Sequence, residues 1–123
     1  MLLASSMAGI GFGNAGVHLP HGMSYPVAGM VKGFQPSGYE VDHPIVPHGM
    51  SVILNTPAVI CFTAEACPER HLRAAAALGA DVLDACPEDA GLILTDVVIR
   101  FLKRLDIPNG LSAVGYGEED IPF

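Results

Sequence analysis

Charged residues are scarce in this sequence, and basic ones are the scarcest. The 123 residues include only six Lys and Arg against thirteen Asp and Glu, for a net charge of −7 and a charged fraction of 15%. Ordinary soluble domains carry about 25% charged residues. A nucleic-acid-binding role is excluded, because it needs a basic patch. Half of the residues are hydrophobic, which excludes a disordered chain. We expect much of the surface to be covered by other protein.

Long apolar runs and targeting signals are also lacking. No window reads as a membrane span, which takes about 20 consecutive apolar residues. The apolar stretch Met1–Ile10 has no positive charge, and the first basic residue is Lys32, so a secretory signal peptide is not expected. The length suits one domain. We expect residues 1–123 to form a single, incomplete domain, a fragment of a larger protein.

Cysteine is sparse and poorly placed for metal binding. The three residues, Cys61, Cys67 and Cys86, contain no Cys-x-x-Cys pair. This spacing argues against a disulfide framework or a zinc–thiolate site, and it favours a reducing compartment. We expect the three thiols to be buried as small hydrophobic groups.

Proline and glycine divide the chain into helices. We predict a tightly packed core helix over 2–15, a short, bent helix within 17–32, a loop over 33–46 and a helix over 48–66 that kinks near Pro57. Further helices are predicted from 68 to 78 and from 87 to about 107, with short helical turns over 111–116 and 118–123. No stretch alternates apolar and polar residues for long, so the predicted fold class is all-α.

Histidine carries the chemical signal. Four of the five histidines, His18, His21, His43 and His48, lie between positions 18 and 48, and the tetrapeptide His-Gly-Met-Ser occurs at both 21–24 and 48–51. Neutral imidazoles on separate segments are good ligands for divalent iron or zinc.

By spacing alone, His21 and His48 make half of a metal site. A third ligand could come from Asp42 or Glu40, although nothing in the sequence places either nearby. The alternative is that both histidines are structural groups at helix ends.

The two motifs also support a resemblance. Residues 9–26 read GIGFGNAGVHLPHGMSYP and residues 41–51 read VDHPIVPHGMS. Together they resemble the helical domain of the iron-containing (group III) alcohol dehydrogenases, most of all its hydroxyacid-oxoacid transhydrogenase branch. Residues 63–72, 78–81, 89–92 and 110–116 continue the likeness along nearly the whole chain.

The resemblance implies a fold and a ligand set. The fold would be the C-terminal helical bundle of the dehydroquinate synthase-like architecture, preceded by a nucleotide-binding α/β domain that these residues lack. His21 and His48 would be the two later metal ligands, after an upstream Asp-x-x-x-His. Many members have a second histidine four residues after the first ligand. Here that place holds Tyr25, which would donate a hydrogen bond or relay a proton as a catalytic group.

The resemblance also implies a function. The intact protein would transfer a hydride through NAD between a small hydroxy acid of the 4-hydroxybutyrate type and an oxo acid of the 2-oxoglutarate type, using a divalent metal, Fe²⁺ or else Zn²⁺. The 123 residues alone would be inactive. Alternatives are a plain NAD-dependent alcohol dehydrogenase and a non-enzymatic helical interaction module.

The expected partners are the small substrate, the missing nucleotide-binding domain and a second copy in a homo-oligomer, with no membrane. The compartment would be a bacterial cytoplasm or the mitochondrial matrix.

Other polar residues receive weaker predictions. His18, three residues before His21, is a candidate for substrate binding, with a structural role as the alternative. Lys32 could meet a substrate carboxylate or lie solvated at a helix end, and His43 lies in the predicted loop. His71 is expected on the surface.

Overall fold

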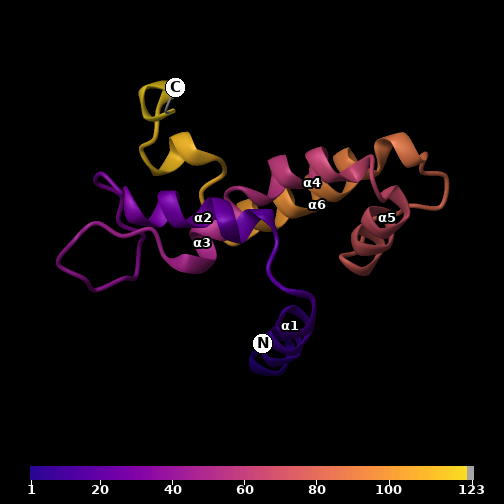
Figure 1. Ribbon diagram of the computed structural model, residues 1–123, viewed down its shortest axis with the longest axis horizontal. Helices are drawn as coiled ribbons and strands as arrows, with labels where there is room; N and C mark the ends of the chain where they lie inside the picture. The colour runs from indigo at the N-terminus through magenta and orange to yellow at the C-terminus, as the bar shows by residue number, and fades with distance from the viewer. Residues whose placement is uncertain (122–123) are drawn as a thin grey trace.

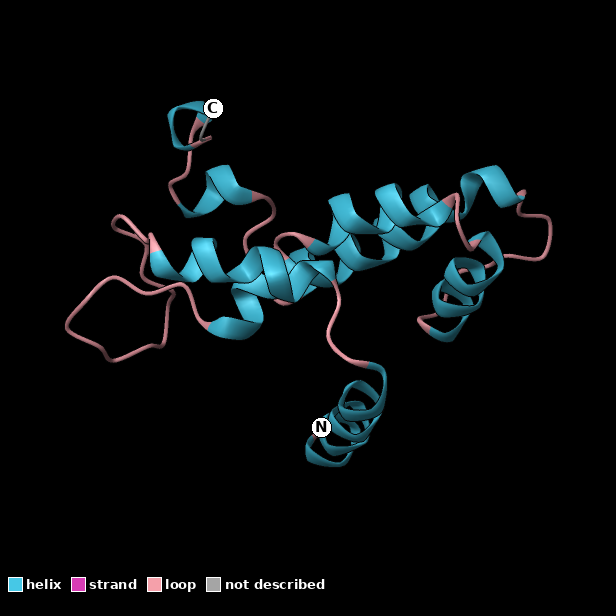
Figure 2. Cartoon of the chain, viewed as in Figure 1, coloured by secondary structure: helices cyan, strands magenta, loops and turns pink. Residues whose placement is uncertain are grey.

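The fold is built from helices, as predicted. The computed structural model describes residues 1–121, and within that range it contains α-helices, 3-10 turns and loops but no strand (Figure 2). The α-helices are α1 Leu2–Ala15, α2 Leu19–Gly29, α3 His48–Ile53, α4 Thr56–Ala64, α5 Pro68–Ala77 and α6 Ala90–Arg104. The short turns are η1 Pro87–Asp89, η2 Leu111–Val114 and η3 Glu118–Asp120. No helix among the described residues is long and apolar enough to cross a membrane.

One half of the body is the packing of α4, α5 and α6, with α4 and α6 side by side in Figure 1. Ile60, Ala75 and Leu94 form its buried core. Gly91 lies where α6 approaches α4 most closely, because a Cβ built on Gly91 would come within 2.9 Å of the Cβ of Ala64. The absent side chain therefore sets the spacing of the two helices.

The other half joins α2, α3 and the C-terminal segment around a second core. Val27, Val46, Leu54 and Val114 are buried together there. The hydroxyl of Tyr116 donates a hydrogen bond of 2.7 Å to the carbonyl of Val27. This bond ties residues 111–121 to the end of α2.

An ion pair reinforces the same attachment. The Lys32 ammonium lies 2.6 Å from a carboxylate oxygen of Asp120 and 3.2 Å from one of Glu119. The Lys32 ammonium, helped by the amide of Gly117, lowers the pKa of Asp120, and the hydrogen bond to Asp120 raises the pKa of Lys32. Lys32 is therefore paired within the chain. This differs from both predicted roles, contact with a substrate carboxylate and solvation at a helix end.

The predicted helix over 48–66 is divided in two. α3 ends at Ile53 and α4 begins at Thr56. Pro57 has no N–H to bond the preceding turn, and its ring crowds that turn's carbonyl, so the chain breaks where we predicted a kink. The buried Asn55 side chain donates to the carbonyl of Ser51 at 2.8 Å and satisfies one group at the break.

α1 forms as predicted, but its predicted burial is wrong for this chain. None of its residues is buried, and Figure 1 shows it projecting away from the body. Gly16 ends it at φ 80°, ψ 171°, a conformation that essentially only glycine adopts. Leu2, Met7 and Ile10 are all more than 60% exposed. A helix that is apolar on every side is normally surrounded by protein, and residues 16–121 do not surround this one.

Two further predictions need correction or fall outside the described range. Cys61 and Cys86 are exposed rather than buried, and only Cys67 is half-buried. The turn predicted over 118–123 is present as η3 Glu118–Asp120. Residues 122 and 123 lie outside the described residues.

Gly91→Ala tests the close approach of α4 and α6. Alanine favours a helix over glycine by about 1 kcal/mol, but overpacking costs about 1–3 kcal/mol. The crowded atoms, the Cβ of Ala64 and the Cα of Cys61, cannot rotate away, so we expect net destabilisation of roughly 1 kcal/mol in urea unfolding. Gly22→Ala, on an open helix face, is the control and should not destabilise. Equal effects of the two changes would contradict the close approach.

The Lys32–Asp120 pair predicts an acid-dependent stability. Because the pKa of Asp120 is lowered on folding, its contribution is present above the ordinary value of 3.8 and is lost as pH falls through the folded value. Because the pKa of Lys32 is raised, the same pairing persists up to 10.5 and is lost above it. The urea midpoint of the native protein should exceed that of Lys32→Met at neutral pH, and the two should converge in acid. Lys103→Met is the control, and a pH-independent difference for Lys32→Met would refute the pairing.

Candidate metal centre

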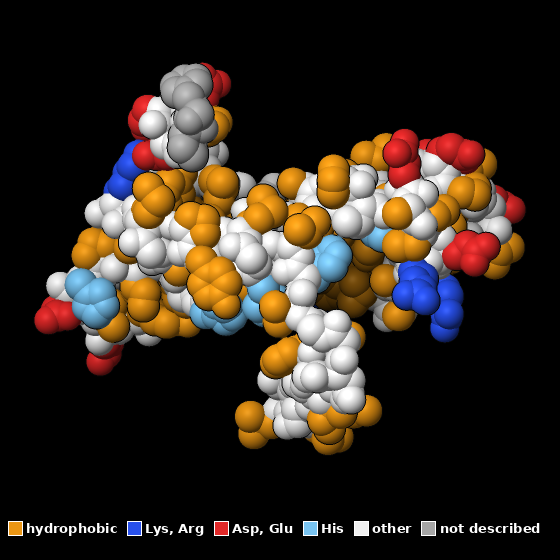
Figure 3. All heavy atoms as spheres, viewed as in Figure 1, with side chains coloured by type: hydrophobic (Ala, Val, Ile, Leu, Met, Phe, Trp, Pro, Cys, Tyr) orange, Lys and Arg blue, Asp and Glu red, His pale blue; other side chains and the backbone are white. Residues whose placement is uncertain are grey.

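The structure brings His21 and His48 together. His21 is the third residue of α2 and His48 the first residue of α3. These two helices pack against each other (Figure 1). The imidazole centroids are 5.3 Å apart, with the rings inclined at 56°. Figure 3 shows histidine side chains gathered on the body near the point where α1 leaves it. Two residues 27 positions apart thus form one imidazole pair.

This spacing fits a shared metal ion. Two imidazoles that bind one ion tetrahedrally, with metal–nitrogen bonds of about 2.1 Å, have centroids about 5 Å apart. The pair is nevertheless half of a site, because no cluster of three His, Cys, Asp or Glu side chains suited to a metal exists within residues 1–121. Neither Asp42 nor Glu40 completes it. Further ligands would have to come from outside the described residues.

The repeated His-Gly-Met-Ser motif has a common local structure. In each copy the serine hydroxyl donates back to the carbonyl of the histidine, Ser24 to His21 at 2.7 Å and Ser51 to His48 at 2.8 Å. Both serines are essentially fully buried, whereas His21 is half-buried and His48 exposed. Each motif thus turns a small, satisfied serine inward and leaves its histidine at the edge of the packed helices.

The surroundings of the pair are open and partly apolar. The ring of Phe12, from α1, lies 6.4 Å from that of His21. Tyr25 follows His21 by one helical turn, a spacing that places both on one helix face, and it is 70% exposed. His18 is the exposed N-cap residue of α2. Both predicted neighbours therefore lie on the helix that carries His21.

The remaining histidines do not join the pair. The exposed His43 lies beside Asp42, with Nδ1 at 2.9 Å from a carboxylate oxygen, and this contact lowers the pKa of Asp42. Because the partner of Asp42 is its own neighbour in the loop, this contact is local.

His71 differs from its prediction. It is half-buried between α4 and α5, with Nδ1 3.0 Å from the carbonyl of Cys67 and Nε2 3.1 Å from the hydroxyl of Thr63. The spacing Thr63, Cys67, His71 is i, i+4, i+8. This spacing is the only sequence feature that indicates contact among the three residues. It could not be interpreted without the structure, because the chain turns from α4 into α5 between Thr63 and Cys67.

Comparison with known proteins agrees with these features. Residues 1–123 match the family described as "Fe-containing alcohol dehydrogenase family, C-terminal". No solved structure matches the chain significantly.

Curated relatives are highly similar but much longer. The chain is 63% identical to a protein of Xenopus tropicalis and 60% identical to one of Homo sapiens, both named "Hydroxyacid-oxoacid transhydrogenase, mitochondrial", with 99% of this chain and 26% of each relative aligned. A protein of Dictyostelium discoideum, named "Probable hydroxyacid-oxoacid transhydrogenase, mitochondrial", is 52% identical over 98% of the chain and 22% of its own length. The chain therefore spans about a quarter of these relatives. Its helical fold and its full-length family match show that it belongs to the Fe-containing alcohol dehydrogenase family, as a C-terminal segment.

Proposed function

We propose that this chain supplies two metal ligands, His21 and His48, to an NAD-linked oxidoreductase. The observation that carries the proposal is the imidazole pair, with ring centroids 5.3 Å apart on two packed helices. Membership of a family named for its iron content supports Fe²⁺ as the metal, with Zn²⁺ as the other ion that imidazoles bind well.

The remaining ligands and the nicotinamide site would belong to residues outside this chain. Catalytic metal sites generally use three protein ligands and leave a position open, and two imidazoles cannot meet that number. When bound, a divalent metal supplies Lewis acidity to an alcohol or carbonyl oxygen, and the nicotinamide supplies the hydride chemistry. The task of the chain's own residues is to hold their two nitrogen donors in place.

Tyr25 and His18 are the nearest candidates to contact a substrate. Tyr25 lies one turn beyond His21 with its ring exposed, so its hydroxyl can donate a hydrogen bond to a bound oxygen or pass on a proton. His18, at the N-cap of α2, would contact the substrate from the same end of the helix.

The names of the relatives support the transhydrogenase reaction for the intact protein. The proposed substrates are a hydroxy acid of the 4-hydroxybutyrate type and an oxo acid of the 2-oxoglutarate type, and a eukaryotic source would place the enzyme in mitochondria. Activity that depends on an added oxo acid and needs no free NAD supports this reaction. Activity that requires free NAD instead indicates a plain alcohol dehydrogenase.

His21→Ala and His48→Ala test the ligand pair in the full gene product. Because each change removes one nitrogen donor, we expect each variant to lose metal content by at least about tenfold and turnover with it. Metal per subunit, measured by mass spectrometry after desalting, is the readout. His43→Ala is the matched control and should retain its metal. Full metal content in either of the first two variants would refute the proposal.

Ser51→Ala tests whether the inward serine positions His48. The change removes the hydroxyl that bonds the His48 carbonyl, so we expect a loss of about 1 kcal/mol in unfolding free energy and metal affinity weakened several-fold. Ser6→Ala is the control, because Ser6 makes a similar bond to the Leu2 carbonyl on an exposed helix, and it should change neither quantity. Unchanged metal affinity in Ser51→Ala would assign the serine to packing alone.

A further inference from the structure

The few basic residues are concentrated on two neighbouring helices. Of the six Lys and Arg in the chain, only Lys32 lies elsewhere. α5 and α6 carry the other five: Arg70, Arg73, Arg100, Lys103 and Arg104. Nearly all the positive charge of a chain with a net charge of −7 therefore lies on these two helices, which also carry Glu69 and Asp96.

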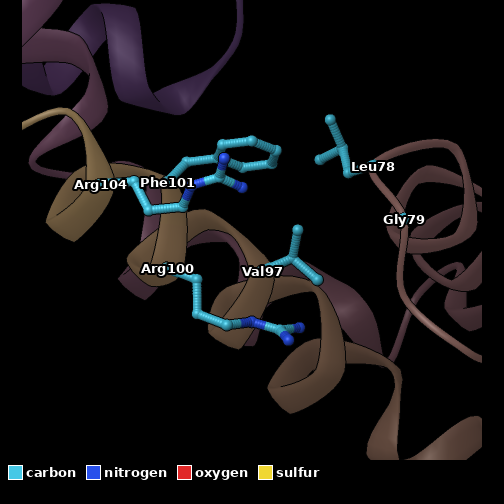
Figure 4. A pocket seen from close by; sticks show the side chains of 6 residues that line it. All are labelled: Leu78, Gly79, Val97, Arg100, Phe101 and Arg104. Atoms are coloured by element: carbon cyan, nitrogen blue, oxygen red, sulfur yellow. The ribbon is translucent and has the colours of Figure 1, made fainter.

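A pocket lies between α6 and the residues that follow α5. Its volume is about 160 Å³, and it is lined by Leu78, Gly79, Val97, Arg100, Phe101 and Arg104. Figure 4 shows the Arg104 side chain lying along Phe101 and the Arg100 side chain extending on the other side of Val97, with Leu78 facing Val97 across the gap. The pocket thus combines two cations with an apolar wall.

The two arginines are weakly paired within the chain. Arg100 lies 3.9 Å from Asp96, with both side chains more than 60% exposed, and Arg104 forms no ion pair with any of residues 1–121. Cations in the last turn of a helix offset its dipole, which accounts for Lys103 and Arg104. The effect fades beyond that turn, so it does not account for Arg100.

We propose that this pocket binds a small dicarboxylate. Side chains four residues apart on a helix lie about 5–6 Å apart at their Cβ atoms, so the two guanidinium groups can each take one carboxylate in a bidentate contact. Val97, Phe101 and Leu78 would cover the carbon chain between the carboxylates. A cavity of about 150 Å³ holds a molecule of six carbon atoms, so the pocket suits a short dicarboxylate. Inorganic phosphate fits less well, because it has no carbon chain to contact Val97, Phe101 and Leu78.

Succinate titration of the full gene product, followed by calorimetry at low ionic strength, tests the site. We expect saturable binding that Arg104→Gln and Arg100→Gln each weaken by at least about tenfold. Lys103→Gln, which removes a neighbouring exposed cation that does not line the pocket, should weaken it less than twofold. Acetate and inorganic phosphate should bind at least tenfold more weakly than succinate.

The same titration on the His21→Ala/His48→Ala double variant separates this site from the proposed metal centre. Retention of binding there supports a second site, and loss of binding contradicts it by placing the succinate at the histidines. Equal weakening by Lys103→Gln and Arg104→Gln would reduce the effect to general charge attraction and overturn the proposal. Phosphate binding as tight as that of succinate would overturn the dicarboxylate assignment, and absence of saturable binding would overturn the site.

Discussion

The packing of α2 against α3 is the constraint on which the candidate site depends. Each helix carries a His-Gly-Met-Ser motif in its first two turns, and each motif buries its serine and keeps its histidine at the edge of the contact. Serine is small enough to let two helices approach, and its hydroxyl is satisfied within its own helix. The imidazoles therefore meet without burying an unpaired polar group, which would cost about 1–3 kcal/mol. The imidazole pair is thus a product of the packing of the two helices.

Most of the fold could be predicted from the sequence because proline and glycine mark its boundaries. Pro20, Pro68 and Pro87 each stand in the first turn of the helix or turn that they begin. The break between α3 and α4 is harder to predict. A proline in the first turn of a new helix and a proline that kinks one continuous helix have the same local sequence, so Pro57 does not distinguish the two. The burial of α1 and of the cysteines was predicted wrongly, because periodicity reports how apolar a segment is and not whether its covering partner is among the residues given.

The candidate site, like the fold, can be predicted from the sequence only in part. The repeated motif in the sequence points to His21 and His48, whereas the 5.3 Å separation of their rings is visible only in the structure. His71 shows the opposite case, since its contacts with Thr63 and Cys67 depend on how α5 turns back from α4. The low charge of the chain is explained in part by α1, which has no charged residue. Its apolar surface is not packed against any of residues 16–121. A protein four times as long, as in the relatives, has the material to cover it.

We propose that one metal ion bridges α2 and α3 through the two imidazoles. The most direct measurement is a crystal structure of the iron-loaded full gene product with anomalous diffraction at the iron edge. We expect a single anomalous peak within about 2.2 Å of a ring nitrogen of both His21 and His48. A peak bonded to only one of these histidines, or to neither, would contradict it.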